Sequence, residues 1–138
     1  MKSILENLTK TTKGTLVEHL DIEFIECSMD KLVARMKVDN KTCRPGNIIH
    51  GGATMALAET VGSGLSFINA DIEKYNVFGI EINANHISTV AFGDYVEASA
   101  TFIHKGKTTQ VVAFVVKDSK GNDISVGRIT NIIIPKSK

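Results

Sequence analysis

The chain has 138 residues, a length that favours one domain, and we expect a single domain over residues 1–138. Its 16 Lys and Arg residues nearly balance its 15 Asp and Glu residues, so the net charge of +1 indicates no basic surface for nucleic acid or an anionic membrane. Because no apolar run is long enough for a membrane span and the first ten residues lack the apolar block of a leader, we expect a cytoplasmic protein with no membrane partner.

The first part of the chain predicts one helix and two strands. Residues 3–13 have a short amphipathic pattern that Gly14 can end. Residues 20–28 alternate between apolar and polar side chains, as a half-buried strand does, and residues 32–38 place four apolar side chains on one face. A polar loop follows over 39–49 and contains Pro45 and Gly46. Cys27 and Cys43 lack the spacing of a metal or redox motif, so we expect free thiols.

The rest of the chain predicts one long helix followed by four strands. The helix spans roughly 51–69, and the strands span about 76–87, 93–105, 107–118 and 123–134, with a turn at 119–122. Strands in succession around a single helix indicate an α+β fold rather than repeated β-α-β units. The simplest packing is an antiparallel sheet wrapped around one central helix.

Helical spacing separates two faces of the long helix. One face would pack against the sheet and comprises Leu57, Val61, Leu65 and Ile68. The other is a small and polar stripe that comprises Gly52, Met55, Glu59, Gly62, Ser63 and Ser66. Glycines inside a helix, here Gly62 and Gly64, destabilise it by about 1 kcal/mol each relative to alanine and usually mark a close approach. A neighbouring helix and a substrate are both open as the approaching group.

Glu59 lies on this stripe among small side chains, with no Lys or Arg three or four residues away and with Ser63 one turn later. A solvated surface carboxylate is the alternative interpretation. His50, Gly51 and Gly52 precede the helix, where uncovered backbone N–H groups carry partial positive charge and can bind a developing oxyanion. An oxyanion site, a histidine and a carboxylate together are what acyl transfer to water requires.

The motifs on and around the helix resemble those of a known family. The stretch HGGATMALAETVGS, preceded by Arg44-Pro45-Gly46, is similar to hotdog-fold acyl-CoA thioesterases of the phenylacetate-degradation and 4-hydroxybenzoyl-CoA branch. The resemblance continues through GIEINANHISTVAFGDYVEASATFIHKGKTTQ and GRITNIII and covers nearly all of residues 20–134. It implies a hotdog fold and the hydrolysis of an acyl-CoA to a free acid and CoA, without a metal or redox cofactor.

The resemblance also assigns roles to individual residues. Glu59 falls at the general base or nucleophile, Gly51 at the amide that binds the thioester carbonyl, and His50 at the histidine that helps to hold that carbonyl. Ser63 matches a hydroxyl that helps to place the acyl group or a water. His86 falls on a histidine found near the substrate in some members, although its phase in the strand also fits a core histidine.

Three further residues are expected to contact the substrate. Lys107 matches a basic position that can meet a CoA phosphate, although it also fits a solvated lysine. Arg44 and Asn47 belong to a run that departs from the family, in which relatives often carry glutamine, proline, an aromatic residue and glycine. Arginine donates hydrogen bonds but cannot accept them, so Arg44 could instead orient the carboxylate of Glu59 or bind an acidic substrate. An ion pair with Arg44 would lower the pKa of Glu59 and weaken it as a base.

Two other functions are open: a hotdog dehydratase acting on a hydroxyacyl thioester, and a non-catalytic acyl-CoA binding protein. A metal site built from His50, Glu59 and His86 is disfavoured, and the identity of the acyl group is left open. Gly51 and Glu59 are eight residues apart, about 12 Å along a helix, so one helix cannot readily bring both to one thioester carbon. We therefore expect a homodimer with two shared sites, in which two antiparallel helices face each other, and by resemblance a homotetramer.

Overall fold

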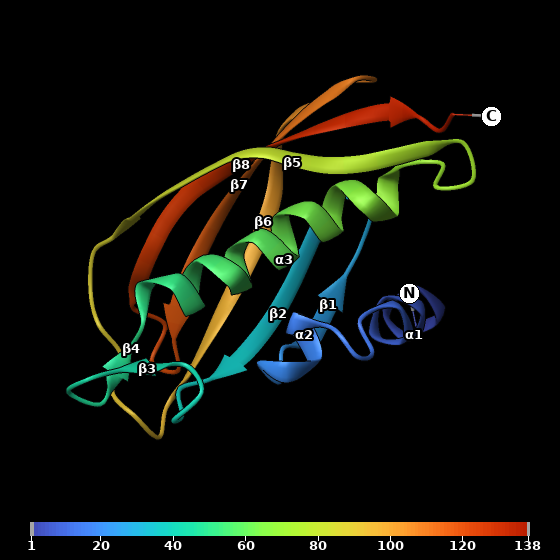
Figure 1. Ribbon diagram of the computed structural model, residues 1–138. Helices are drawn as coiled ribbons and strands as arrows, with labels where there is room; N and C mark the ends of the chain where they lie inside the picture. Colours follow the sequence, from blue (N-terminus) through green and yellow to red (C-terminus); the bar gives the residue numbers. More distant parts are fainter. Residues whose placement is uncertain (1, 138) are drawn as a thin grey trace.

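The computed structural model describes residues 2–137, which form an antiparallel sheet curved around one long helix (Figure 1). The helix α3 (Gly51–Asn69) lies in the concave face of a six-stranded sheet with the strand order β1-β2-β6-β7-β8-β5. The expected α+β architecture, an antiparallel sheet wrapped around a central helix, is confirmed and is that of the hotdog fold.

The elements follow the predicted chain order, with two additions. The six strands of the large sheet are β1 (Glu23–Cys27), β2 (Lys31–Lys37), β5 (Tyr75–His86), β6 (Tyr95–Lys105), β7 (Thr109–Asp118) and β8 (Asp123–Pro135). The N-terminal helix α1 (Lys2–Thr11), β2 and the four strands after α3 end within two residues of the expected positions, and α3 has the expected range. The additions are a short helix, α2 (Leu16–His19), and a hairpin of β3 (Cys43–Arg44) and β4 (Ile48–Ile49) inside the expected polar loop.

The core lies between α3 and the sheet. Leu57, Val61 and Leu65 have no exposed surface, as expected, whereas Ile68 is half-buried. Alternate residues of β7 and of the first half of β6 are buried against the helix, as period-two burial in a sheet requires. Burial of this apolar layer is the main favourable contribution to the fold.

The glycines of α3 pack against the sheet of their own chain. A methyl group added to Gly62 would lie 2.4 Å from Cγ2 of Ile129 on β8, and one added to Gly64 would lie 2.7 Å from Cδ2 of Leu32 on β2. Gly62 and Ser66 are buried, so the expected small and polar stripe is wrong for these two residues. The close approach that the glycines permit is made by the sheet, not by a neighbouring helix or a substrate.

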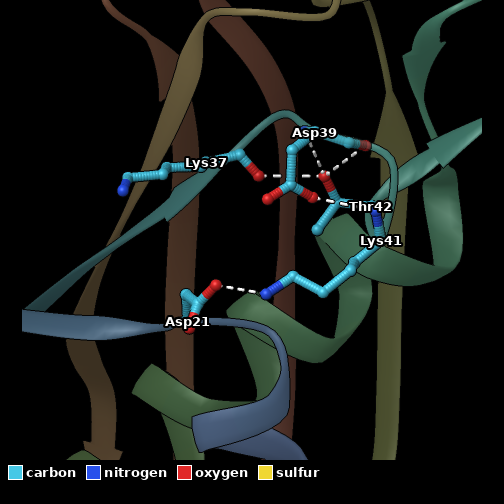
Figure 2. Close-up of polar contacts among 5 residues, drawn as sticks. All are labelled: Asp21, Lys37, Asp39, Lys41 and Thr42. Carbon is cyan, nitrogen blue, oxygen red and sulfur yellow. Dashed lines mark hydrogen bonds and ion pairs between the residues drawn. The ribbon is translucent and has the colours of Figure 1, made fainter.

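A turn over residues 39–42 connects β2 to β3 and sets the path into α3 (Figure 2). The buried Thr42 hydroxyl accepts a hydrogen bond from the Asp39 N–H and donates one to the Lys37 carbonyl, each 2.9 Å long. At the surface, the Lys41 ammonium pairs with the carboxylate of Asp21. That hydrogen-bonded pair lowers the pKa of Asp21 and raises the pKa of Lys41 from their usual values.

Two further expectations concern the chain as a whole. Cys27 and Cys43 are both free, as expected, and burial raises the pKa of the Cys27 thiol. Within residues 2–137, no helix has both the length and the apolar character needed to cross a bilayer.

Candidate active site

The N-terminus of α3 presents an uncovered backbone amide. His50 is the N-cap, and its Nδ1 accepts a hydrogen bond of 2.8 Å from the Gly52 N–H. Since Nδ1 is the acceptor, the neutral imidazole carries its proton on Nε2. In the described part of the chain, no partner is present for the Gly51 N–H. This amide lies at the positive end of the helix dipole, where a negative oxygen is stabilised.

Thr42 holds this helix start in place from the preceding turn. Its carbonyl accepts a hydrogen bond of 2.8 Å from the His50 N–H, and its own side chain is only 1% exposed. The turn in Figure 2 is therefore linked directly to His50. Thr42 could not be singled out from the sequence, because a threonine in a polar loop carries no signal that its hydroxyl is buried.

His86 approaches the helix start from β5. A methyl group added to Gly51 would lie 2.9 Å from Nε2 of His86, so the imidazole packs directly on this glycine. Its Nδ1 is 3.1 Å from the hydroxyl of Ser125 on β8. The side chain is exposed in the isolated chain, so the interpretation of His86 as a core histidine is wrong.

A cavity of about 200 Å³ lies at this corner and brings together Arg44, Gly51 and His86. The guanidinium of Arg44 donates a hydrogen bond of 2.8 Å to the Pro45 carbonyl at the tip of the β3–β4 hairpin. Among residues 2–137, no ion pair joins Arg44 to Glu59. Arg44 therefore faces the helix start and does not orient the Glu59 carboxylate within one chain.

Glu59 lies two turns further along α3, over the edge strand β5. Its side chain is exposed, and a methyl group added to Gly79 would lie 3.3 Å from Oε1. No hydrogen bond or ion pair to the carboxylate occurs within the described residues. Ser63 follows one turn later and is half-buried. The carboxylate is thus free to act on a group placed above Gly79.

A β-bulge in β5 places both Gly79 and His86 against α3. Residues of odd and even number normally point to opposite faces of a strand. The register between β5 and β8 shifts between Gly79 and Glu81, which inserts Ile80 as an extra residue. This bulge reverses the alternation, so that Gly79 lies under Glu59 and His86 lies under Gly51.

Asn131 of β8 anchors α3 beneath Glu59 and was not identified from the sequence. Its side chain is fully buried, and Nδ2 donates hydrogen bonds to the Gly62 carbonyl at 3.2 Å and to the Ser66 hydroxyl at 2.8 Å. Its Oδ1 lies 3.5 Å from the position of a methyl group on Gly79. An asparagine within the otherwise apolar end of β8 was the only available signal.

Two expected substrate contacts, Asn47 and Lys107, do not line the cavity at the corner formed by Gly51 and His86. Asn47 has a φ of 54°, a left-handed conformation that favours Asn or Gly, and its carbonyl accepts a hydrogen bond from the Phe92 N–H. Its position in the hairpin turn therefore has a conformational explanation. Lys107 is exposed near the C-terminal end of α3, beside a cavity that Asn69 also lines. Within residues 2–137, no three His, Cys, Asp or Glu side chains group closely enough to hold a metal ion.

Comparisons with known proteins identify relatives over almost the whole chain. The 1,4-dihydroxy-2-naphthoyl-CoA hydrolase of Escherichia coli (strain K12) is 36% identical over 133 residues, which are 96% of each protein. A crystal structure of thioesterase PA1618 from Pseudomonas aeruginosa, with one glutamine changed to alanine, has a TM-score of 0.91 at 35% identity and covers 96% of this chain and 94% of that one.

A thioesterase from Staphylococcus aureus subsp. aureus Mu50 is also similar. Its structure, likewise with one glutamine changed to alanine, has a TM-score of 0.84 at 37% identity and covers 87% of this chain and 98% of that one. Another structure of the same protein carries alanine in place of a glutamate that is fifteen residues after this glutamine. Arg44 and Glu59 have the same separation.

A family profile that matches the centre of the chain shows the family to which the chain belongs. The profile of the thioesterase superfamily matches residues 46–125, which include α3, the bulge of β5 and His86. The match spans more than half of the chain, and the relatives above extend it to nearly all of it. The chain therefore belongs to the thioesterase superfamily.

Proposed function

We propose that this protein hydrolyses an acyl-CoA thioester to a free acid and CoA. The observation that carries the proposal is that α3 carries two groups without a partner in the described residues: the Gly51 N–H and the Glu59 carboxylate. Thioester hydrolysis needs one group to stabilise the carbonyl oxygen and another to supply or activate a nucleophile. The name of the Escherichia coli relative supports a CoA ester as the substrate class.

In this mechanism the thioester carbonyl oxygen binds to the Gly51 N–H, with the Nε2–H of His50 as a second donor. Glu59 either removes a proton from a water as it attacks the carbonyl carbon, or attacks that carbon itself to give a mixed anhydride that water then hydrolyses. In both routes the carbon–sulfur bond breaks, the sulfur leaves as a thiolate that takes up a proton, and the water oxygen ends in the acid. His86 would orient the substrate against Gly51, and Ser63 would help to place the acyl group or the water.

The proposed active unit is a two-fold homodimer with shared sites. Gly51 and Glu59 are about 12 Å apart along α3, whereas both must come within roughly 3–3.5 Å of the reacting atoms. The edge strand β5 supports such a dimer, since among the described strands it pairs only with β8, and it carries Phe78 and Ile80 with 51% and 57% of their surface exposed. Pairing of two β5 edges would set two α3 helices side by side and bring Gly51 of one protomer to Glu59 of its partner.

Two substrate contacts and two properties of the whole protein complete the proposal. Arg44 would take the place of the glutamine found in relatives, a view supported by its fifteen-residue separation from Glu59. Lys107 would meet a CoA phosphate from its position near the end of α3, with Asn47 shaping the turn that carries Arg44. The protein would form a homotetramer of two such dimers in the cytoplasm, where its two free thiols stay reduced.

A panel of acyl-CoA thioesters tests this function, with CoA release followed by a thiol-reactive chromophore. We expect stoichiometric CoA and free acid. Formation of an enoyl thioester from a hydroxyacyl-CoA, without CoA release, would instead identify a dehydratase. Tight binding of acyl-CoA with no turnover across the panel would identify a binding protein.

A further inference from the structure

An apolar cavity begins beside Glu59 and follows α3 toward its C-terminus. It has a volume of about 270 Å³ and is lined by residues from α1 and the turn after it, α2, α3, β1 and β5. Thr60 and Ser63 form its near end and follow Glu59 by one and four residues. Val77 of β5 also lines the cavity, two residues before Gly79, over which the Glu59 carboxylate lies. The lining of the cavity thus includes residues that are close in sequence to Glu59 and to Gly79, although neither of these two lines it.

The lining of this cavity offers almost nothing to a polar ligand. Among the described side chains, none that is charged lines it. Its threonines, Thr11, Thr12 and Thr60, each donate their hydroxyl hydrogen to a backbone carbonyl three or four residues earlier, so these hydrogens are not available to a ligand. Ser63 supplies the remaining hydroxyl, close to Glu59. A charged or strongly polar group at the far end would lose its hydration without gaining partners.

A second cavity adjoins the first along the same helix. It has a volume of about 390 Å³ and continues past Ile68 to Ile72. The two cavities share Leu8 and Thr11 of α1 and Phe67 of α3. These three residues belong to the linings of both cavities, and Phe67 and Leu8 are the largest of them. Phe67 is eight residues after Glu59, which is about 12 Å along the helix axis.

We propose that the first cavity binds the acyl group of a medium-chain, uncharged acyl thioester, and that Phe67 with Leu8 forms the end wall that limits acyl length. The reacting carbonyl would sit at Glu59 and the alkyl chain would run toward Phe67. The N-terminal helix α1 thereby becomes a specificity element, although it lies outside the segment that matches the superfamily profile. The inference rests on the proposed function for the position of the carbonyl.

Binding of S-alkyl-CoA thioethers tests the cavity without requiring hydrolysis, because a thioether has no carbonyl to attack. Calorimetric affinities for the wild-type protein should rise by up to about fourfold for each added methylene. The increase should stop when the chain reaches the wall. Equal affinities for S-ethyl-CoA and S-octyl-CoA would overturn the inference.

Phe67→Ala tests the wall, with Phe102→Ala as the matched control. Phe102 is half-buried on β6, packs against the core and lines neither cavity. Phe67→Ala should join the two cavities and extend the rise in affinity to longer alkyl chains, while Phe102→Ala keeps the wild-type chain-length limit. Phe67→Leu is the milder variant should the alanine variant fail to fold, and it should shift the limit in the same direction. An unchanged limit in the folded Phe67 variant would contradict the proposed wall.

Val77→Phe tests the cavity from the opposite direction by filling it. Affinity for S-octyl-CoA should fall toward that of S-ethyl-CoA, which should itself be little changed.

The same variants assayed with acyl-CoA substrates separate the proposed acyl-binding cavity from the proposed thioesterase activity. The expected chain-length pattern in binding without any hydrolysis would retain the cavity and reject the enzyme. Hydrolysis that is indifferent to acyl length would retain the enzyme and reject the cavity.

Discussion

At the scale of single residues, the proposed hydrolysis depends on a carboxylate that has no bonding partner within the described part of one chain. Glu59 forms no hydrogen bond or ion pair within residues 2–137, although the loop residues around the helix start are extensively bonded. Its carboxylate lies over Gly79 of β5, which has no side chain and therefore leaves room above the sheet. Such a carboxylate either is solvated or acts on a ligand, and the two alternatives predict different turnover when Glu59 is substituted.

Glu59→Gln should keep the fold and lose turnover. The side chain is exposed and unpaired, so the free energy of unfolding should be unchanged. Loss of a general base should lower kcat by about 10²- to 10⁴-fold, and loss of a nucleophile should lower it at least as far. The measurement is kcat on the best acyl-CoA together with urea unfolding. Near-normal turnover by the folded variant would assign Glu59 to the solvated surface.

Arg44→Gln should raise kcat/KM or broaden the range of acyl groups accepted. The substitution restores the residue type expected from relatives and replaces a pure donor by a side chain that also accepts hydrogen bonds. The comparison is kcat/KM for wild type and variant across the acyl-CoA panel. A clear drop for every substrate would instead give Arg44 its own role, with an anionic part of the substrate.

The residues of the candidate site differed in how readily the sequence revealed them. Glu59 and the His50-Gly51 pair stand out because their residue types are unusual at the start and middle of an apolar helix. His86 could be found but not interpreted, since its exposure depends on a bulge. Asn131 and Thr42 were missed because their roles arise from burial, which is a property of the folded chain and not of its local pattern.

At the scale of elements, turns and bulges position the groups that the helix carries. The ends of α3 are encoded locally, by the small residues at its start and the Asp71-containing turn after it, and could be predicted. The bulges in β1 and β5 could not, because a bulge is a mismatch between two strands that are distant in sequence. In β1, the bulge places Ile25 on the exposed side and Cys27 in the core.

Thr42→Val should destabilise the protein and lower its activity. The variant keeps the shape of the side chain but leaves the Asp39 N–H and the Lys37 carbonyl without their buried partner, at a cost of about 1–3 kcal/mol. Activity should fall further than stability explains, because the loss of the two side-chain hydrogen bonds would loosen the turn whose Thr42 backbone carbonyl accepts from the His50 N–H. Urea unfolding and kcat measure the two effects.

Asp21→Asn is the control for the Thr42 variant. It weakens the surface pair with Lys41, which is solvent-screened, so neither stability nor kcat should change measurably. If the two variants behave alike, then the turn in Figure 2 does not position His50.

Gly62→Ala should lower stability even though alanine favours a helix by about 1 kcal/mol over glycine. The added methyl group would lie 2.4 Å from Ile129, so the helix must shift or Ile129 must leave its packed position, and overpacking of this kind costs about 1–3 kcal/mol. The free energy of unfolding in urea is the measurement. A more stable variant would contradict the conclusion that the sheet is the close neighbour of this glycine.

At the scale of the whole molecule, the proposed mechanism gives one chain two half-sites rather than one complete site. The Gly51 corner and Glu59 lie on the same helix but face different parts of β5, whose outer edge is partly apolar and pairs with no other strand within residues 2–137. The fold and the position of its central helix could be predicted from the sequence, because the spacing of apolar residues fixes both. The pairing of two chains could be anticipated only from the length of the helix between Gly51 and Glu59.

Subunit complementation tests the shared site most directly. His50→Ala and Glu59→Ala chains, each inactive alone, are mixed after reversible dissociation, and subunit exchange is verified by mass spectrometry of differently tagged chains. Half of the dimers in a random mixture combine both variants, and each of these has one intact site and one doubly damaged site. If the two subunits share each site, roughly a quarter of the wild-type activity should be recovered. No recovery despite proven exchange would contradict the shared site, because His50 and Glu59 would then serve one site from the same chain.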